Sequence, residues 1–117
     1  MSPKREIRDY LNDILESVDD IRSFTRETSF DVFVTDKKTI NAVVRSLEII
    51  GEATKKIPVD IRASYPHIPW QEIAGMRDKL AHEYFGVDLE IVWETSQKDL
   101  QEFYTAVSNI KSSFPPD

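Results

Sequence analysis

The sequence predicts an all-α fold, an antiparallel bundle of four main helices with a short connecting helix. Two observations indicate this fold class. Apolar residues recur at three- and four-residue steps over long stretches, and no stretch alternates convincingly between apolar and polar residues. A length of 117 residues suits a single domain with one modest core, so we expect residues 1–117 to form one folding unit.

The first predicted helix starts at Ser2 and Pro3, which suit the N-cap and the first helical position. Its apolar positions share one helical face, as an amphipathic helix requires. They are Ile7, Tyr10, Leu11, Ile14, Leu15, Val18, Ile21 and Phe24. The short apolar link from Phe30 to Val34 is expected to form a further turn of helix beneath the core.

Asp36 is the expected N-cap of a second long helix, because its short carboxylate can accept hydrogen bonds from the first backbone N–H groups. The apolar stripe of this helix consists of Ile40, Val43, Val44, Leu47, Ile50 and Ile57. Gly51 lies within the stripe, where it costs about 1 kcal/mol relative to alanine. A glycine at this position indicates that another helix approaches closely.

The connector that follows contains three prolines and is expected to include one short helix from Val59 to Ser64. Pro69 is expected to open a third main helix and Gly86 to close it. Asp88 is the expected N-cap of the last helix. The stripe of that helix consists of Leu89, Val92, Trp93, Leu100, Phe103, Tyr104, Val107 and Ile110.

The composition, with 40% hydrophobic and 31% charged residues, is typical of a soluble globular protein, and we expect a cytoplasmic one. No apolar run approaches the length of a membrane span. The absence of cysteine excludes disulfides and thiolate metal sites, and the histidines are not clustered. We therefore expect neither a metal site of the usual kinds nor a cofactor.

The formal net charge of −6 argues against broad, nonspecific nucleic-acid binding, because contacts to phosphates dominate that affinity. A local basic groove is still compatible with the sequence, since many cations lie in the middle of the chain. They are Lys37, Lys38, Arg45, Lys55, Lys56, Arg62, Arg77 and Lys79. A solvated surface of mixed charge is the simpler interpretation of this distribution.

The segment from Met76 to Tyr84 is the strongest candidate for a functional site. At about 100° per residue from Trp70, Arg77 falls in the middle of the apolar stripe of its helix. A buried-face arginine must pair with a carboxylate such as Glu48 or Glu52, or face a cleft or a partner. We favour the second interpretation, because a guanidinium group can bind a phosphate in a bidentate manner.

His82 lies four residues after Asp78, so the aspartate carboxylate can accept a hydrogen bond from one imidazole nitrogen. The other nitrogen would then be free to transfer a proton. Tyr84 shares the predicted face of Arg77 and could equally be a core aromatic residue. The spacing alone is weak, because Arg62 and His67 repeat it with Pro66 between them.

This residue set suits RNA cleavage by the RNA's own 2′-hydroxyl, which needs a base, an acid and a cation on the phosphate. One chain offers only one suitable histidine. Arg77 and His82 also point about 140° apart on their predicted helix, which makes convergence within one chain difficult. A two-fold homodimer would bring two arginines and two histidines into one cleft.

The sequence resembles the HepT-type HEPN proteins along nearly its whole length. The resemblance rests on the segment Ile68–Tyr84, on Gly86–Asp88 with Val92 and Trp93, and on Arg45–Ala53, which is similar to the family's second helix. It implies a HEPN-like bundle that forms a homodimer and acts as a metal-independent RNase toxin.

The same resemblance implies that Arg77 and His82 are catalytic and that Asp78 occupies a position where the family commonly has a polar residue. It also implies a cognate partner, a minimal nucleotidyltransferase antitoxin that silences the toxin by AMPylation of Tyr84. The alternative is a non-catalytic HEPN subunit that assists a partner nucleotidyltransferase. The acidic net charge mildly favours this alternative, since an RNA-cutting enzyme benefits from positive steering.

Overall fold

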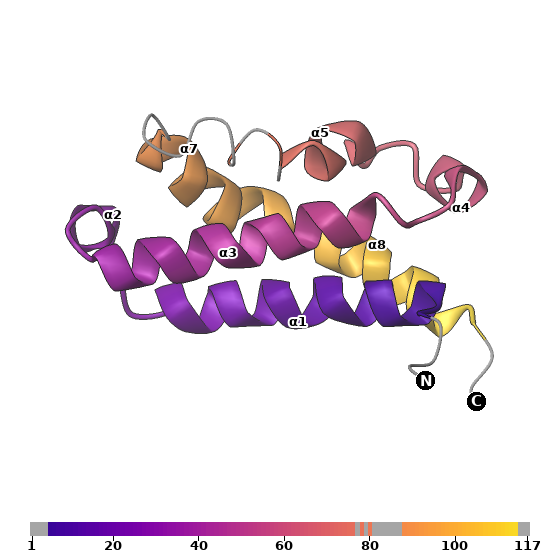
Figure 1. Ribbon diagram of the computed structural model, residues 1–117, viewed down its shortest axis with the longest axis horizontal. Coiled ribbons are helices and arrows are strands. Elements are labelled where there is room, and N and C mark those ends of the chain that lie inside the picture. Colours follow the sequence, from indigo (N-terminus) through magenta and orange to yellow (C-terminus); the bar gives the residue numbers. More distant parts are fainter. Residues whose placement is uncertain (1–4, 77, 79, 81–87, 115–117) are drawn as a thin grey trace.

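The computed structural model describes residues 5–76, 78, 80 and 88–114, and every regular element within these ranges is a helix (Figure 1). In chain order the elements are α1 (Ile7–Thr25), α2 (Phe30–Phe33), α3 (Lys37–Thr54), α4 (Val59–Ala63), α5 (Trp70–Ala74), α7 (Leu89–Glu94), the π-helical turn η2 (Thr95–Asp99) and α8 (Leu100–Ser112). The predicted all-α fold class is confirmed. No described helix is both long and apolar enough to cross a membrane.

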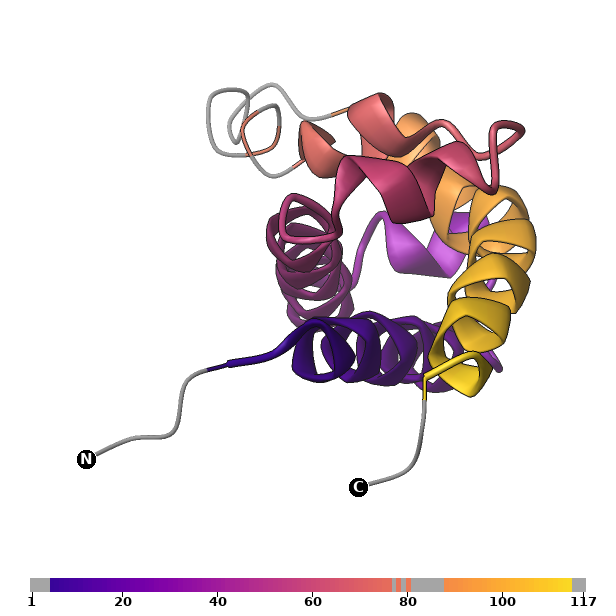
Figure 2. The same ribbon diagram turned by 90° about the vertical axis from the view of Figure 1, so that its right-hand side faces the viewer.

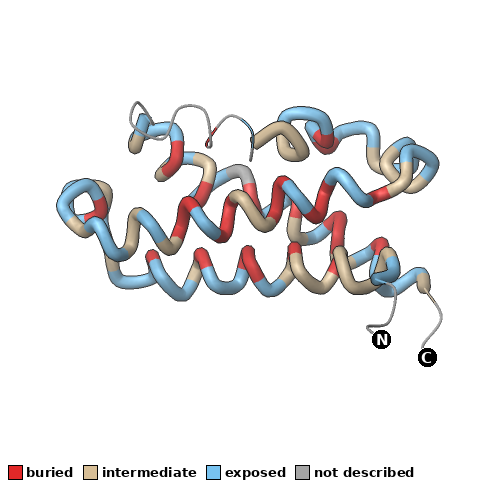
Figure 3. The backbone as a smooth tube through the Cα atoms, in the orientation of Figure 1, coloured by how far each residue is buried: buried red, intermediate tan, exposed pale blue. Residues whose placement is uncertain are grey.

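The helices form a bundle around one core. α1 and α3 lie side by side and antiparallel, and α8 packs on the other side of α1 (Figure 2). α4 and α5 lie across the remaining side, with α5 packed on α3 (Figure 2). Buried positions recur along the helices (Figure 3), and the most deeply buried large side chains come from α1, α2, α3 and α8. They are Leu11, Ile14, Val18, Ile21, Phe33, Val43, Leu47, Ile50, Phe103 and Val107.

Two predicted helix caps are confirmed. The Asp36 carboxylate accepts hydrogen bonds from the Thr39 backbone N–H at 3.2 Å and from the Thr39 hydroxyl at 2.6 Å. The hydroxyl bond is the main reason that the pKa of Asp36 lies below its ordinary value. The Asp88 carboxylate accepts from the backbone N–H groups of Glu90 at 2.9 Å and Ile91 at 3.4 Å. These caps fix the starts of α3 and α7.

The predicted start of the first helix is wrong. Arg5 and Glu6 are not helical, and α1 begins at Ile7 rather than directly after Ser2 and Pro3. The Asp9 carboxylate accepts a hydrogen bond from the Glu6 backbone N–H at 2.9 Å. This contact satisfies a donor at the helix start, which gives the helix a later beginning than the proline suggested.

The predicted single helix from Pro69 to Gly86 is interrupted at Gly75, which is the C-cap of α5. Gly75 forms a turn, and helical residues resume at Met76. A Cβ atom at Gly75 would lie 3.3 Å from the Gln71 carbonyl oxygen, a tighter contact than most side chains make. Within the described residues, the stretch that begins with α5 is therefore not one continuous helix.

The predicted last helix contains a π-helical turn at Thr95–Asp99 that the apolar stripe did not indicate. Polar contacts surround this turn. The buried Ser96 hydroxyl donates to the Trp93 carbonyl at 2.7 Å, and the Gln97 amide donates to the Thr25 hydroxyl at 3.0 Å. Thr25 in turn donates to the Ile21 carbonyl at 2.9 Å. The turn thus connects the last helix to the end of α1.

Candidate functional site

The structure describes one of the four predicted site residues, Asp78. Arg77, His82 and Tyr84 lie outside the described residues, and so do the predicted Asp78–His82 hydrogen bond and the alternative pairing of Arg77 with Glu48 or Glu52.

Asp78 is exposed and lies against the end of α3. Its Oδ2 atom is 3.2 Å from Nζ of Lys55, and the two side chains are 57% and 36% exposed, respectively. Lys55 is the C-cap residue of α3, and its backbone N–H donates to the Gly51 carbonyl at 3.2 Å. This ion pair joins the candidate segment to the end of the second long helix.

Sequence reasoning missed the contact between Lys55 and Asp78 because the two residues lie 23 positions apart. The sequence does contain a weak signal, since Lys55 is one of the basic residues near the middle of the chain. Spacing along the chain cannot reveal a pairing that depends on how α5 packs on α3.

Apolar contacts hold the described residues around Asp78 against the bundle. Leu80 is only 8% exposed and Met76 is half-buried. On the other side of Gly75, the Trp70 ring lies edge-on to the Phe103 ring, with centroids 5.7 Å apart. Its indole N–H donates to the Tyr65 carbonyl at 3.0 Å. The alternation of buried Leu80 and exposed Asp78 agrees with the predicted amphipathic character of this segment.

The second arginine–histidine pair has structural partners. The Arg62 guanidinium donates to the Thr54 carbonyl at 2.6 Å and to the Ile57 carbonyl at 3.0 Å. It thereby satisfies a carbonyl in the last turn of α3 and one just beyond it, where such groups lack helical partners. His67 Nε2 lies 3.6 Å from Oε1 of Glu102. α4 ends at Ala63, so no helix links Arg62 to His67, as expected from Pro66 between them.

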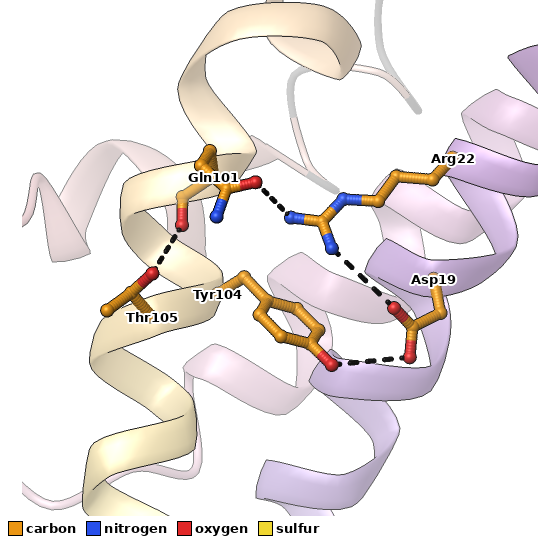
Figure 4. Close-up of polar contacts among 5 residues, drawn as sticks. All are labelled: Asp19, Arg22, Gln101, Tyr104 and Thr105. Carbon is orange, nitrogen blue, oxygen red and sulfur yellow. Dashed lines mark hydrogen bonds and ion pairs between the residues drawn. The ribbon is translucent and has the colours of Figure 1, made fainter. Parts of the chain in front are cut away.

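A further polar cluster joins α1 to α8 (Figure 4). The Arg22 guanidinium donates to the Gln101 side-chain oxygen at 2.6 Å, and its carbon lies 4.5 Å from the centre of the Tyr104 ring. Asp19 accepts from the Tyr104 hydroxyl at 3.4 Å and lies 3.7 Å from Arg22. The cluster connects two bundle helices, whereas Asp78 contacts α3, so it is a packing feature separate from the candidate site.

Within residues 5–76, 78, 80 and 88–114, no three or more acidic or histidine side chains are arranged to hold a metal ion. Beside the candidate segment, the Asp78 carboxylate is paired with the Lys55 ammonium group, and both side chains are exposed. Such a pair can interact with a polar ligand from solvent, because neither group is deeply buried.

The fold and the site together define an all-α bundle with a polar candidate segment held against the end of its second long helix. A model of the family "Ribonuclease HepT-like" matches residues 14–110, which include the whole Met76–Tyr84 segment. The chain therefore belongs to the ribonuclease HepT-like family.

Curated relatives agree with this assignment. Two proteins of Methanocaldococcus jannaschii, each named "putative RNase", are 57% and 55% identical over 100 residues. These matches cover 86% of this chain and 83% and 86% of the relatives. A Thermococcus cleftensis protein named "probable ribonuclease HepT" is 55% identical over 97 residues, which cover 83% of this chain and 88% of that protein. No solved structure matches the chain.

Proposed function

We propose that this chain is a metal-independent endoribonuclease toxin of a toxin–antitoxin pair, with Arg77 and His82 as its catalytic residues. The observation that carries the proposal is the family match over residues 14–110, which spans the complete Arg77–Tyr84 motif. The ribonuclease names of three relatives, each at least 55% identical, support the same activity.

In the proposed reaction, the His82 imidazole of one chain removes the proton from the RNA 2′-hydroxyl. The 2′-oxygen attacks phosphorus, and the bond from phosphorus to the 5′-oxygen breaks. The His82 imidazolium of the second chain donates a proton to the leaving 5′-oxygen. The products are a 2′,3′-cyclic phosphate and a free 5′-hydroxyl, and Arg77 binds the phosphate while negative charge develops.

Asp78 is proposed to orient His82 by accepting a hydrogen bond from one imidazole nitrogen. Its carboxylate also lies 3.2 Å from the Lys55 ammonium group. A carboxylate has two oxygens and several lone pairs, so one Asp78 side chain can accept from both groups. The contact with Lys55 is thus compatible with the proposed role of Asp78.

The homodimer is proposed because the reaction benefits from two proton-transfer groups and each chain has one motif histidine. His67, the other histidine of the chain, lies beside Glu102 of α8. A two-fold interface that contains the motif would place two copies of His82 and two copies of Arg77 around one RNA phosphate.

Silencing is proposed to occur by AMPylation of Tyr84, catalysed by a cognate minimal nucleotidyltransferase with ATP as the AMP donor. The tyrosine oxygen attacks the α-phosphorus of ATP, its proton is lost to a base, and pyrophosphate leaves. The added phosphate brings negative charge and bulk next to Arg77, where an RNA phosphate would otherwise bind. Modification would therefore block the substrate electrostatically as well as sterically.

The direct test is RNA cleavage by the purified chain in excess EDTA. We expect cleavage at the same rate with and without EDTA, and products that end in 2′,3′-cyclic phosphate. Loss of activity in EDTA would contradict the metal-independent mechanism.

The partner can be tested by expression and mass. Expression of the chain alone should stop growth, and co-expression with the nucleotidyltransferase should add mass in AMP units. Tyr84→Phe should prevent this addition, whereas Tyr104→Phe, on the α1–α8 cluster, should not. Harmless expression together with no RNA cleavage would favour the alternative, a non-catalytic subunit that assists the nucleotidyltransferase.

A further inference from the structure

We propose that Lys55, which forms an ion pair with Asp78, binds a backbone phosphate of the RNA beside the candidate segment. This inference rests on the proposed RNase function and adds a residue to its substrate-binding surface. The observation behind it is the 3.2 Å contact between the Lys55 ammonium group and Asp78, a neighbour of Arg77 in the sequence.

The backbone that carries Lys55 is firmly anchored. The Lys55 N–H donates to the Gly51 carbonyl at 3.2 Å, and the preceding residue, Thr54, is fully buried. Ile57, two residues after Lys55, is also buried. Arg62 donates hydrogen bonds to the carbonyls of both Thr54 and Ile57. The Lys55 side chain therefore starts from a fixed point, which reduces the entropy lost when it binds a ligand.

The Lys55 ammonium group is available to a ligand. Its side chain is 36% exposed, and an ammonium group has three N–H donors, of which a single carboxylate oxygen uses one. The exposed ion pair contributes little net stability in water. A phosphate that approaches from solvent can thus bind Lys55 without first displacing Asp78.

Two nearby cations provide a comparison. Arg62 already donates to two backbone carbonyls and has a structural role. Lys56 is exposed, directly follows Lys55 and forms no ion pair with any residue that the structure describes. Lys55 is a cation of this helix end that contacts the candidate segment, and Lys56, which is also exposed, is a control of equal charge.

The sign of the effect at Asp78 separates phosphate binding from a purely structural tether. If Lys55 binds phosphate, loss of the ammonium group weakens RNA binding. Loss of the Asp78 charge then leaves binding equal or tighter, because the carboxylate repels phosphate. If the pair only fastens the segment to α3, removal of either partner should have the same effect on RNA binding.

The experiment measures binding of a fluorescein-labelled single-stranded RNA of about 20 nucleotides, by anisotropy, in a His82→Ala background that prevents cleavage. We expect Lys55→Met to weaken binding about fivefold to tenfold and to lower the salt slope of log K by about 0.7. Lys56→Met should change affinity less than twofold. Lys55→Arg should keep the parent affinity, and Asp78→Asn should bind at least as tightly as the parent.

Equal losses in Lys55→Met and Lys56→Met would overturn the proposal, since they would indicate a general charge effect. A loss in Asp78→Asn as large as that in Lys55→Met would also overturn it and support the tether. The outcome is independent of the cleavage assay. If the wild-type chain binds RNA through Lys55 but never cuts it, the proposed RNase function fails while this inference stands.

Discussion

The chain contains two arginines that are each followed five residues later by a histidine, and the two pairs differ in their sequence context. In the first pair, Arg62 donates to two carbonyls at the end of α3 and His67 lies beside Glu102. The second pair, Arg77 and His82, lies outside the described residues, but its neighbour Asp78 faces Lys55 and solvent. The comparison teaches that the spacing alone does not identify a functional pair, because the first pair has structural partners.

The first pair, Arg62 and His67, has a structural role. Pro66 separates its members, α4 ends at Ala63, and each side chain of the pair has a partner elsewhere in the chain. The second pair belongs to the segment that carries the sequence resemblance, and the family match over residues 14–110 includes both pairs. Substitutions at matched positions of the two pairs should therefore separate activity from stability.

The largest expected difference concerns the two histidines. His82→Ala should lower the RNA cleavage rate at least about 100-fold, because general acid–base catalysis contributes that much or more. His67→Ala should keep the wild-type rate within about twofold. The measurement is the initial rate of cleavage of one labelled RNA in EDTA. Comparable losses in both variants would contradict the distinction between a catalytic His82 and a structural His67.

Substitution of the two arginines should affect different properties, RNA cleavage for Arg77 and stability for Arg62. Arg77→Ala should lower cleavage by about 100-fold, as expected for the loss of a group that stabilises a developing charge. Arg62→Ala should instead destabilise the fold by about 1–3 kcal/mol, because two carbonyls lose their donor. Urea unfolding, followed by tryptophan fluorescence, measures this loss.

A matched control for the second arginine prediction is Arg45→Ala, since Arg45 is exposed on α3. It should change stability by no more than about 0.5 kcal/mol. The structural assignment of Arg62 would be contradicted if its alanine variant were as stable as the Arg45 variant and had lost RNA cleavage.

The smallest expected effect concerns Glu102, the partner of His67. The two side chains are 55% and 70% exposed, and their closest atoms are 3.6 Å apart. Such exposed pairs contribute little, so Glu102→Gln should change the free energy of unfolding by less than about 0.5 kcal/mol. It should leave the rate of RNA cleavage unchanged. A large loss of activity would indicate that this end of the connector takes part in function.

Local sequence signals predicted much of the fold. Asp36 and Asp88 cap their helices as expected, because a cap depends on residues within three positions of each other. The regular apolar stripes predicted the faces that α1, α3 and α8 bury, except that Phe24, expected in the first stripe, is 40% exposed. These features could be predicted because each depends on neighbours along the chain.

The features that sequence reasoning missed depend on tertiary contacts or on one unusual backbone position. The π-helical turn is accompanied by contacts from Gln97 to Thr25 of α1, 72 residues away in sequence. The role of Arg62 depends on the fold of the connector over the end of α3. Gly75 interrupts a stretch whose apolar spacing looked continuous. The Lys55–Asp78 pair likewise appears only once α5 packs on α3.

The sequence predicted which segment carries the candidate site, but not how the side chains of that segment are arranged. The family match includes this segment, and the structure shows Lys55 as a partner of Asp78. The roles of Arg77, His82 and Tyr84 stay predictions. Arg77 and His82 have the same spacing as Arg62 and His67 but a different sequence context.

The central claim is that one chain provides half of a catalytic site. The most direct test is a heterodimer of one wild-type chain and one His82→Ala chain, purified through two different tags. If one histidine from each chain serves the same cleft, this heterodimer should cleave RNA at least about 100-fold more slowly than the wild-type dimer. A heterodimer that retains half of the wild-type rate, or a chain that is fully active as a monomer, would contradict the claim.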